Sequence, residues 1–322
     1  MTAVTSEEMR SSVRPSDEDR IVRLNSVSEK RLIDPEVALT GSITKDQVIP
    51  DRLLSICDLD LDLTEEQKQV LAREEVGSML KMGIRFEAIL MAGFALAVAK
   101  TDNFTDPRIV YLLHEMGEET RHSRVFIRLL GQLETKAVEP FRGRFQEEVF
   151  KRVIRYLVTR PAPLFSMVVA GEEIPDLVNR MIGEDPESDP YLAAVNRYHR
   201  QEEARHLAYA RIVLPDLWRS ATPYQRYFIN SIAPILVWTM FTTLVHPGVY
   251  ERIGLPAMAT WKQVNDSPTR IDLRRIATRP ILKSLTNAGA IDGSRIPKGW
   301  RKLCGVTVDG HEKPLRKVSP SI

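Results

Sequence analysis

Hydrophobic and polar positions recur along most of this chain with the period of an α-helix. The clearest segment begins where Thr64 and Gln67 form the pattern of a capping box, and it is predicted to run as one helix to about Lys100. Its second part, residues 86–99, is apolar nearly all round and contains a single charge, Glu87. This pattern predicts a central buried helix with one carboxyl group inside.

Two later segments begin in the same way, with an Asp suited to capping a helix and a Pro suited to its first turn. Asp106–Pro107 precedes a segment that is predicted to be helical to about Leu130. Asp189–Pro190 precedes a segment that is predicted to be helical to about Leu214. The repetition indicates that the chain contains two similar helical halves.

The remaining segments also favour helices. Helices are predicted at about 145–158 and 164–182, on either side of a break at the prolines of 161–163. The uncharged segment 227–245 is predicted to be a buried core helix, and the basic tail 247–322, rich in Pro and Gly, a short helix with loops. No segment alternates with the two-residue period of a strand, so the fold class is predicted to be all-α.

The composition indicates the class of protein and its cellular location. The chain has 322 residues, of which 43% are hydrophobic and 27% charged, as in ordinary soluble proteins, and its net charge is only +2. No nucleic-acid partner is therefore expected, and no membrane span, because Asn, Ser, Pro and Thr dilute segment 227–245. The two isolated cysteines, Cys57 and Cys304, favour a reducing, cytoplasmic location. The polar residues 1–30 are predicted to be a disordered leader.

The candidate chemistry lies in a five-residue motif that occurs twice and is called the repeated phrase below, EETRH at 118–122 and EEARH at 202–206. Residues i and i+3 lie within roughly 60° of each other on a helix. Glu119 and His122 therefore project from one face, as do Glu203 and His206. A carboxylate and an imidazole that converge on one point suit a divalent transition metal such as iron.

Two isolated glutamates strengthen this interpretation. Glu87 and Glu172 both lie in apolar segments, where an unpaired carboxylate would be costly to bury. The distance from the isolated Glu to the motif Glu is 32 positions in the first half (119 − 87) and 31 in the second (203 − 172). Four helices that supply two single glutamates and two Glu-x-x-His motifs match the carboxylate-bridged dimetal bundles. The sequence predicts a ferritin-like bundle with pseudo-two-fold symmetry.

One more histidine shares this face. His199 lies one turn before Glu203, so it is predicted to be an additional nitrogen ligand on one metal only. The metal-binding core is expected at about 64–245, within a single domain that covers 31–322. The candidate metal ligands are Glu87, Glu119, His122, Glu172, His199, Glu203 and His206. No catalytic residue is predicted beyond these ligands, and no site for an organic cofactor.

Neighbouring groups receive simpler interpretations. The other charged residues of the repeated phrase, Glu118 with Arg121 and Glu202 with Arg205, are predicted to form solvated salt bridges. Glu115 is expected to support the ligands or to lie on the helix surface. An apolar lining of the site is predicted from Met91, Phe94, Met167 and Val168.

With these residues assembled, the sequence resembles the di-iron arylamine N-oxygenases of the p-aminobenzoate N-oxygenase type. The likeness covers roughly residues 64–245. It rests on the two Glu-x-x-His motifs, the two further glutamates, and a third histidine four residues before the second motif, which here is His199. Most ferritin-like di-iron enzymes lack that third histidine, which makes it the most discriminating feature.

The resemblance implies a non-haem di-iron oxygenase with two Fe ions, or Mn at one or both positions, and O2 as co-substrate. A peroxo-diferric intermediate would oxygenate an aromatic amine toward a hydroxylamine or nitro product. An external electron donor or reductase is implied, and a homodimer is possible. If the substrate is an aminobenzoate, an Arg in the pocket should pair with its carboxylate, but the sequence singles out none.

Other functions share the metal pattern. A radical-generating ribonucleotide reductase subunit should carry a Tyr one turn after the first motif histidine, where this chain has Phe126. An iron-storage ferritin should be a shorter bundle. A fatty-acyl desaturase or hydroxylase remains the strongest enzymatic alternative, because substrate type depends on the shape of the pocket. A metal-binding structural protein is the non-enzymatic alternative.

Overall fold

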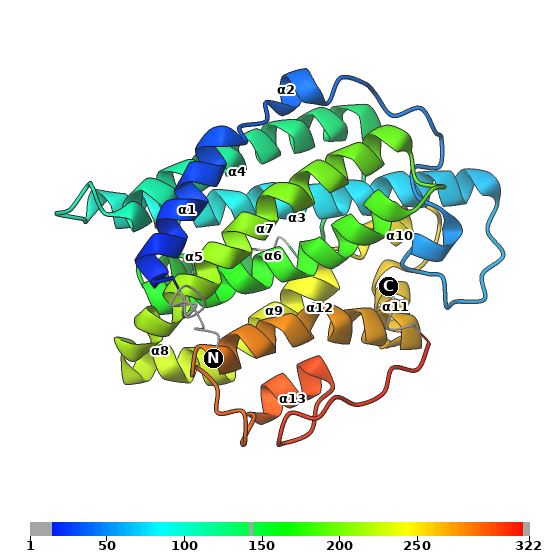
Figure 1. Cartoon of the computed structure of the whole chain (residues 1–322). Coiled ribbons are helices and arrows are strands. Elements are labelled where there is room, and N and C mark those ends of the chain that lie inside the picture. Colours follow the sequence, from blue (N-terminus) through cyan, green and yellow to red (C-terminus); the bar gives the residue numbers. More distant parts are fainter. Residues whose placement is uncertain (1–14, 142–143, 318–322) are drawn as a thin grey trace, which may run out of the picture.

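Four long helices form the centre of the structure and lie side by side (Figure 1). The structure is a computed structural model that describes residues 15–141 and 144–317. Helix α3 pairs with α4, α6 pairs with α7, and contacts of α3 with α6 and of α4 with α7 close the bundle. The four helices are α3 (Glu65–Ala99), α4 (Pro107–Leu133), α6 (Pro161–Glu184) and α7 (Pro190–Arg219).

Local signals in the sequence start three of these helices, α3, α4 and α7, where they were predicted to start. Thr64 Oγ1 accepts a hydrogen bond from the backbone N–H of Gln67, which completes the capping box of α3. Asp106 caps α4 through the N–H of Arg108, and Asp189 caps α7 through two backbone N–H groups. These side chains satisfy donors that the first helical turn leaves unpaired. The two-half organisation thus follows from local capping chemistry.

The all-α prediction is confirmed, and the bundle is ferritin-like. Among the described residues, β pairing is limited to one isolated bridge between Val306 and Glu312. Shorter helices surround the bundle. They are α1 (Asp17–Lys30), α2 (Pro35–Ala38), α5 (Arg144–Val158), α8 (Pro223–Tyr227), α9 (Ala233–Thr243), α10 (Gly248–Glu251), α11 (Ala257–Asp266), α12 (Pro268–Asn287) and α13 (Lys298–Cys304), with a 3₁₀ turn at Asp51–Leu53.

The prediction of a disordered leader is wrong for residues 17–30, which form helix α1, while residues 1–14 lie outside the described part of the chain. Ser16 caps the helix, and α1 packs across α4 and α7 (Figure 1). Ile21 and Asn25 turn inward, and the Asn25 amide donates to the Pro107 carbonyl at 2.9 Å. The acidic composition of this segment concealed a buried face at i and i+4 spacing.

The prolines interrupt fewer helices than was predicted. Pro161 and Pro163 lie in the first turn of α6, where backbone N–H groups need no partner, so the break falls at Arg160. The axes of α5 and α6 meet there at 110°. Helix α7 continues through Pro215 to Arg219 instead of ending near Leu214. Pro175 also lies inside its helix, α6.

The uncharged segment 227–245 is not one regular helix. Helix α8 passes into a π-helical turn, Phe228–Ile232, before α9 begins. The N–H of Ala233 bonds to the carbonyl of Phe228, and the Trp300 indole donates to the carbonyl of Ile229 at 3.0 Å. The indole thus gives a partner to a carbonyl that Pro234, which has no N–H, cannot satisfy from the next turn.

The C-terminal part of the chain is more helical than the predicted loop-rich tail. Helix α12 packs against α6 and α7, and α13 packs against α12 and α9 (Figure 1). The buried positions Ala277, Ile281 and Leu285 of α12 follow the i, i+4 pattern of an amphipathic helix. Pro280 and the surrounding arginines obscured this pattern in the sequence.

Two helical stretches are long and apolar enough to cross a membrane by length and composition, Glu65–Ala99 and Pro223–Glu251. The bent pair Glu147–Val158 and Pro161–Glu184 would add a third if it counted as one span. In the apolar windows of the first two, 22% and 50% of the residues are buried within the structure. These lengths count against the prediction of no membrane span, which stays a prediction.

Candidate metal centre

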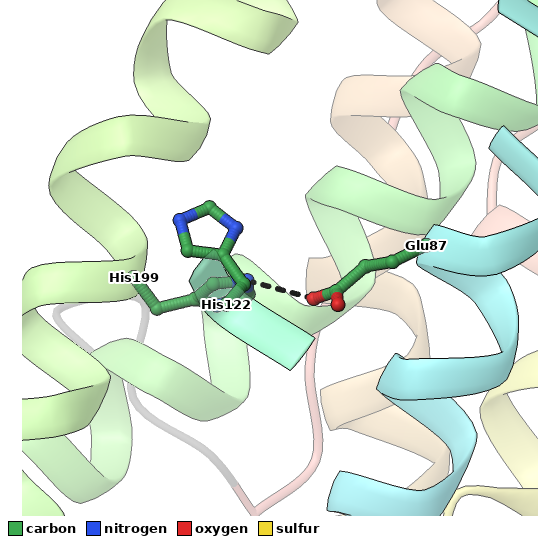
Figure 2. Close-up of side chains that lie close together, drawn as sticks. All are labelled: Glu87, His122 and His199. Carbon is green, nitrogen blue, oxygen red and sulfur yellow. Dashed lines mark ion pairs between the residues drawn. The ribbon is translucent and has the colours of Figure 1, made fainter. Parts of the chain in front are cut away.

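The four central helices bring all seven predicted ligands together inside the bundle in two groups. Within each group the potential ligand atoms lie within 4.8 Å of one another, and every residue is buried. Figure 2 shows part of the first group, in which the Glu87 carboxylate from α3 reaches toward the imidazoles of His122 and His199. The first group is Glu87, His122 and His199, and the second is Glu119, Glu172, Glu203 and His206.

Two glutamates connect the groups. Glu203 Oε1 lies 3.2 Å from His122 Nδ1 and 3.0 Å from His199 Nε2, while its Oε2 lies 2.7 Å from His206 Nδ1. Glu119 likewise lies 3.3 Å from His122 Nδ1 and 3.4 Å from His206 Nδ1. Each carboxylate therefore has one oxygen toward each group, as a ligand that bridges two metal ions does.

The polar atoms at the centre fit a pair of cations. Four buried atoms of the cluster form no hydrogen bond of good geometry among the described residues, although two of them, His199 Nε2 and Glu203 Oε1, lie only 3.0 Å apart; the other two are Glu87 Oε1 and Glu119 Oε1. Buried polar atoms without partners are costly unless an ion satisfies them. Four carboxylates also carry a charge that two divalent cations would neutralise, and three imidazoles complete a mixed oxygen and nitrogen set that suits iron or manganese.

The protonation of the cluster shows how strongly its charges interact. Burial raises the pKa of Glu119 to about 7, and the negative charge of Glu203 adds to this effect. Burial also raises the pKa of Glu172 well above its usual value. Burial would raise the pKa of Glu203 too, but the positive charges of His206 and His199 outweigh it and lower that pKa well below its usual value. The carboxyl groups of Glu119 and Glu172 therefore bind a proton more readily than that of Glu203.

The outer nitrogen of each motif histidine bonds to the opposite copy of the repeated phrase. His122 Nε2 lies 2.9 Å from Glu202 Oε2 on α7, and His206 Nε2 lies 2.8 Å from Glu118 Oε2 on α4. Both glutamates are at least 97% buried. The prediction that they form solvated salt bridges is wrong. A carboxylate on the outer imidazole nitrogen fixes the ring so that Nδ1 faces the cluster, where it could bind a metal ion.

The arginines of the repeated phrase belong to the same buried network. Arg205 contacts Glu118 at 2.8 Å and Glu202 at 3.4 Å, and Arg121 lies 3.8 Å from Glu202. The Tyr198 hydroxyl donates to Glu202 at 2.8 Å. These donors help to keep both carboxylates ionised, although burial alone would raise their pKa values.

The two glutamates with the least certain roles are also buried. Glu115 is fully buried, neither of its carboxylate oxygens has a hydrogen-bond partner among the described residues, and burial raises its pKa to about 8. It therefore lies in the interior and not on the helix surface. Glu173 is not part of the cluster that contains its neighbour Glu172, and it forms an ion pair with Arg211.

A cavity of about 80 Å³ adjoins the cluster, and Glu87, Glu172 and His199 form part of its wall. The rest of the wall is almost entirely apolar and includes Met79, Met82, Phe86, Phe126, Ile174, Val178, Met240 and Leu244. The predicted lining residues, Met91, Phe94, Met167 and Val168, are not on the wall of this cavity, and the last three lie in the packed core.

Comparison with known proteins agrees with this centre. The family model of the p-aminobenzoate N-oxygenase (AurF) matches residues 15–289, which is most of the chain and includes every predicted ligand. This chain belongs to the p-aminobenzoate N-oxygenase family.

Curated relatives of this family member include uncharacterised proteins from Mycobacterium bovis and Mycobacterium tuberculosis. Each is 27% identical to the chain over 183 residues, which is 56% of this chain and 53% of the relative. The chain thus spans about half the length of the curated relatives that it matches. Their descriptions carry no activity, so they do not extend the functional assignment.

Three residues of this p-aminobenzoate N-oxygenase family member hold the histidines of the site without having been predicted to do so: Glu118, Glu202 and Asn179. The Asn179 amide donates to His199 Nδ1 at 2.7 Å and so holds the third histidine. A signal for the two glutamates was present, because both copies of the repeated phrase begin with the same residue. No comparable signal marked Asn179, which is 20 positions from His199 and reaches it only through the packing of α6 on α7.

Proposed function

We propose that this protein is an O2-dependent di-iron oxygenase that N-oxygenates an aromatic amine. The observation that carries the proposal is the two groups of ligands joined by Glu119 and Glu203, with a cavity against one side. The reaction would place one oxygen atom of O2 on the amine nitrogen and reduce the other to water. An external donor would supply the two electrons and two protons. Membership of the N-oxygenase family supports this reaction class.

The residues of the chain would hold the metals and control the space around them. One group would hold a metal through Glu87, His122 and His199, and the other through Glu119, Glu172, Glu203 and His206. Two bound iron ions, or manganese at one or both positions, would supply the redox chemistry that reduces O2. Glu118 and Glu202 orient the motif histidines, and the apolar wall keeps bulk water away from the reacting atoms.

The size of the cavity favours an aromatic amine over a fatty-acyl chain. At about 80 Å³ it is smaller than the ~150 Å³ cavity that admits benzene in an engineered protein. A single ring would enter after small movements of flexible side chains such as Met79 and Met82, which line the wall. A long acyl chain would displace far more of the packed core.

The test is a turnover assay with competing substrate classes. The full-length protein is loaded with iron, reduced chemically, and exposed to isotopically labelled O2 together with a panel of arylamines and fatty-acyl thioesters. We expect mass spectrometry to find labelled hydroxylamine or nitro products from the arylamines. Labelled or desaturated acyl products without arylamine products would replace this proposal with the acyl oxidase alternative.

A matched pair of variants separates the metal centre from general stability. Glu203→Gln removes the charge of a bridging carboxylate, whereas Glu74→Gln changes a buried glutamate that accepts from the backbone of Lys136 and Ala137 outside the centre. We expect Glu203→Gln to lose turnover and iron, and Glu74→Gln to keep both. If the protein binds substantially less than one metal ion per chain after growth with ample iron, the oxygenase proposal is wrong.

A further inference from the structure

Beyond its candidate metal ligands, the described wall of the cavity beside the cluster has no positively charged side chain for a substrate. Among the residues that the structure describes, its ionisable wall residues are Glu87, Glu172 and His199, and no Lys or Arg lines it. All three are predicted metal ligands. The other polar side chains on the wall are Asn179 and Asn196, both more than 90% buried. A carboxylate on the substrate would therefore enter an apolar space without a cation to pair with it.

The two asparagines differ in what they leave available. Asn179 is engaged with His199 through its amide nitrogen at 2.7 Å. Asn196 donates from Nδ2 to the carbonyl of Leu192 at 2.8 Å, one turn earlier on α7. This bond uses the amide nitrogen and leaves Asn196 Oδ1 to accept from a ligand. Asn196 is thus the polar group on the wall that is best placed to bind an uncharged donor.

Basic residues line a different cavity that shares one residue with the first. Lys81, Arg85 and His246 belong to a second cavity of about 440 Å³, and Met82 lines both cavities. Arg85 is paired with Glu139 at 2.7 Å. Of the basic residues of this second cavity, Lys81 is therefore the one most able to pair with a substrate carboxylate.

We propose that this chain acts on an uncharged aromatic amine and not on an aminobenzoate, with Asn196 Oδ1 as the polar contact inside the cavity. This inference rests on the proposed function, whose substrate class it narrows. It departs from the substrate that gives the family its name, because the described part of the wall has no Lys or Arg to pair with a benzoate carboxylate. The selected substrate has an apolar ring with, at most, a neutral hydrogen-bond donor.

The experiment measures binding and requires no turnover. The full-length iron-loaded protein, without reductant, is titrated calorimetrically near neutral pH with 4-aminobenzamide, 4-aminobenzoate and 4-methylaniline. The first two ligands have nearly the same shape and differ in charge. We expect both neutral ligands to bind at least about tenfold more tightly than the benzoate, since it alone must bury an unpaired charge. Equal or tighter binding of the benzoate overturns the proposal, as does failure of both neutral ligands to bind.

Three variants locate the contacts. Asn196→Ala should weaken 4-aminobenzamide roughly threefold to tenfold and leave 4-methylaniline unchanged, as expected for one lost hydrogen bond. Asn265→Ala is the matched control, because Asn265 is equally buried, donates to Trp261 O one turn earlier, and lines neither cavity. Lys81→Met should not change benzoate binding. If it abolishes tight benzoate binding, the carboxylate lies in the second cavity and the proposal is wrong.

The binding result and the turnover result can fail separately. If the neutral ligands bind preferentially but no arylamine is oxidised, the preference of the cavity stands and the proposed reaction is wrong. If 4-aminobenzoate is bound more tightly and is oxidised, the proposed reaction stands and the inference about substrate charge is wrong.

Discussion

The crossed contacts between the two repeated phrases predict that each outer glutamate controls one metal position. Glu118 on α4 bonds to His206, which belongs to the group with Glu119, Glu172 and Glu203. Glu202 on α7 bonds to His122, in the group with Glu87 and His199. Glu118→Gln should therefore weaken metal at the His206 position, and Glu202→Gln at the His122 position, although each substitution lies on the opposite helix.

The magnitude follows from the geometry of these bonds. The His206 and Glu118 atoms are 2.8 Å apart, and the pKa of Glu118 is lowered to about 2 because bonds and charges from His206 and Arg205 outweigh its burial. The glutamate is thus ionised near neutral pH. Replacing a carboxylate that holds a ligating histidine weakens metal binding about 10–100-fold, or ~1.4–2.7 kcal/mol. The bridging glutamates transmit only part of this loss to the second metal.

The assay is equilibration of iron-loaded protein with a graded series of chelator concentrations, followed by measurement of iron per chain. We expect each single variant to lose one metal at about 10–100-fold lower chelator activity than the parent and to retain the other, and the double variant to lose both. Glu74→Gln, a buried glutamate outside the cluster, is the control. If Glu118→Gln and Glu202→Gln release iron like this control, the crossed network does not orient the ligands.

Three further substitutions test the surroundings of the centre. Gly171→Ala should lower the free energy of unfolding by about 1–3 kcal/mol, because a Cβ there would collide with the Phe86 ring. Adding Phe86→Leu should recover part of this loss in chemical denaturation. An unchanged denaturation midpoint for Gly171→Ala would contradict the close packing. Asp189→Ala should lower the free energy of unfolding by ~2–4 kcal/mol, because the Asp189 carboxylate caps α7 and also accepts hydrogen bonds from the backbone of Thr44 and Lys45. A loss below about 1 kcal/mol would mean that these bonds contribute little. Burial raises the pKa of Glu75 to about 7, so the folded state binds the extra proton between about pH 4.5 and 7. The stability that this proton contributes is complete below that window and is lost as the pH rises through 7. The free energy of unfolding of the parent should therefore fall by ~3 kcal/mol across the window, and Glu75→Gln should remove this fall. A variant with the same pH profile as the parent would show that Glu75 does not titrate there.

Much of the fold could be predicted because its signals are local. Thr64, Asp106 and Asp189 start helices by bonding to backbone groups within three residues, so the sequence around each position is sufficient. The Glu-x-x-His spacing fixes which side chains share a helical face in the same way. Helix α1 escaped prediction because its stability comes from packing on α4 and α7, which its polar composition does not reveal.

The sequence by itself determined that the chain is helical and which seven side chains are candidate ligands, since caps and ligand spacing act within one turn of a helix. Only the tertiary structure decided how these ligands divide into two groups, that Glu118 and Glu202 hold the histidines of the opposite helix, and that no Lys or Arg of the described residues lines the cavity. These properties depend on which faces of α3, α4, α6 and α7 meet. A contact between residues 80 or more positions apart, such as Glu202 with His122, leaves no mark in the local pattern of either helix.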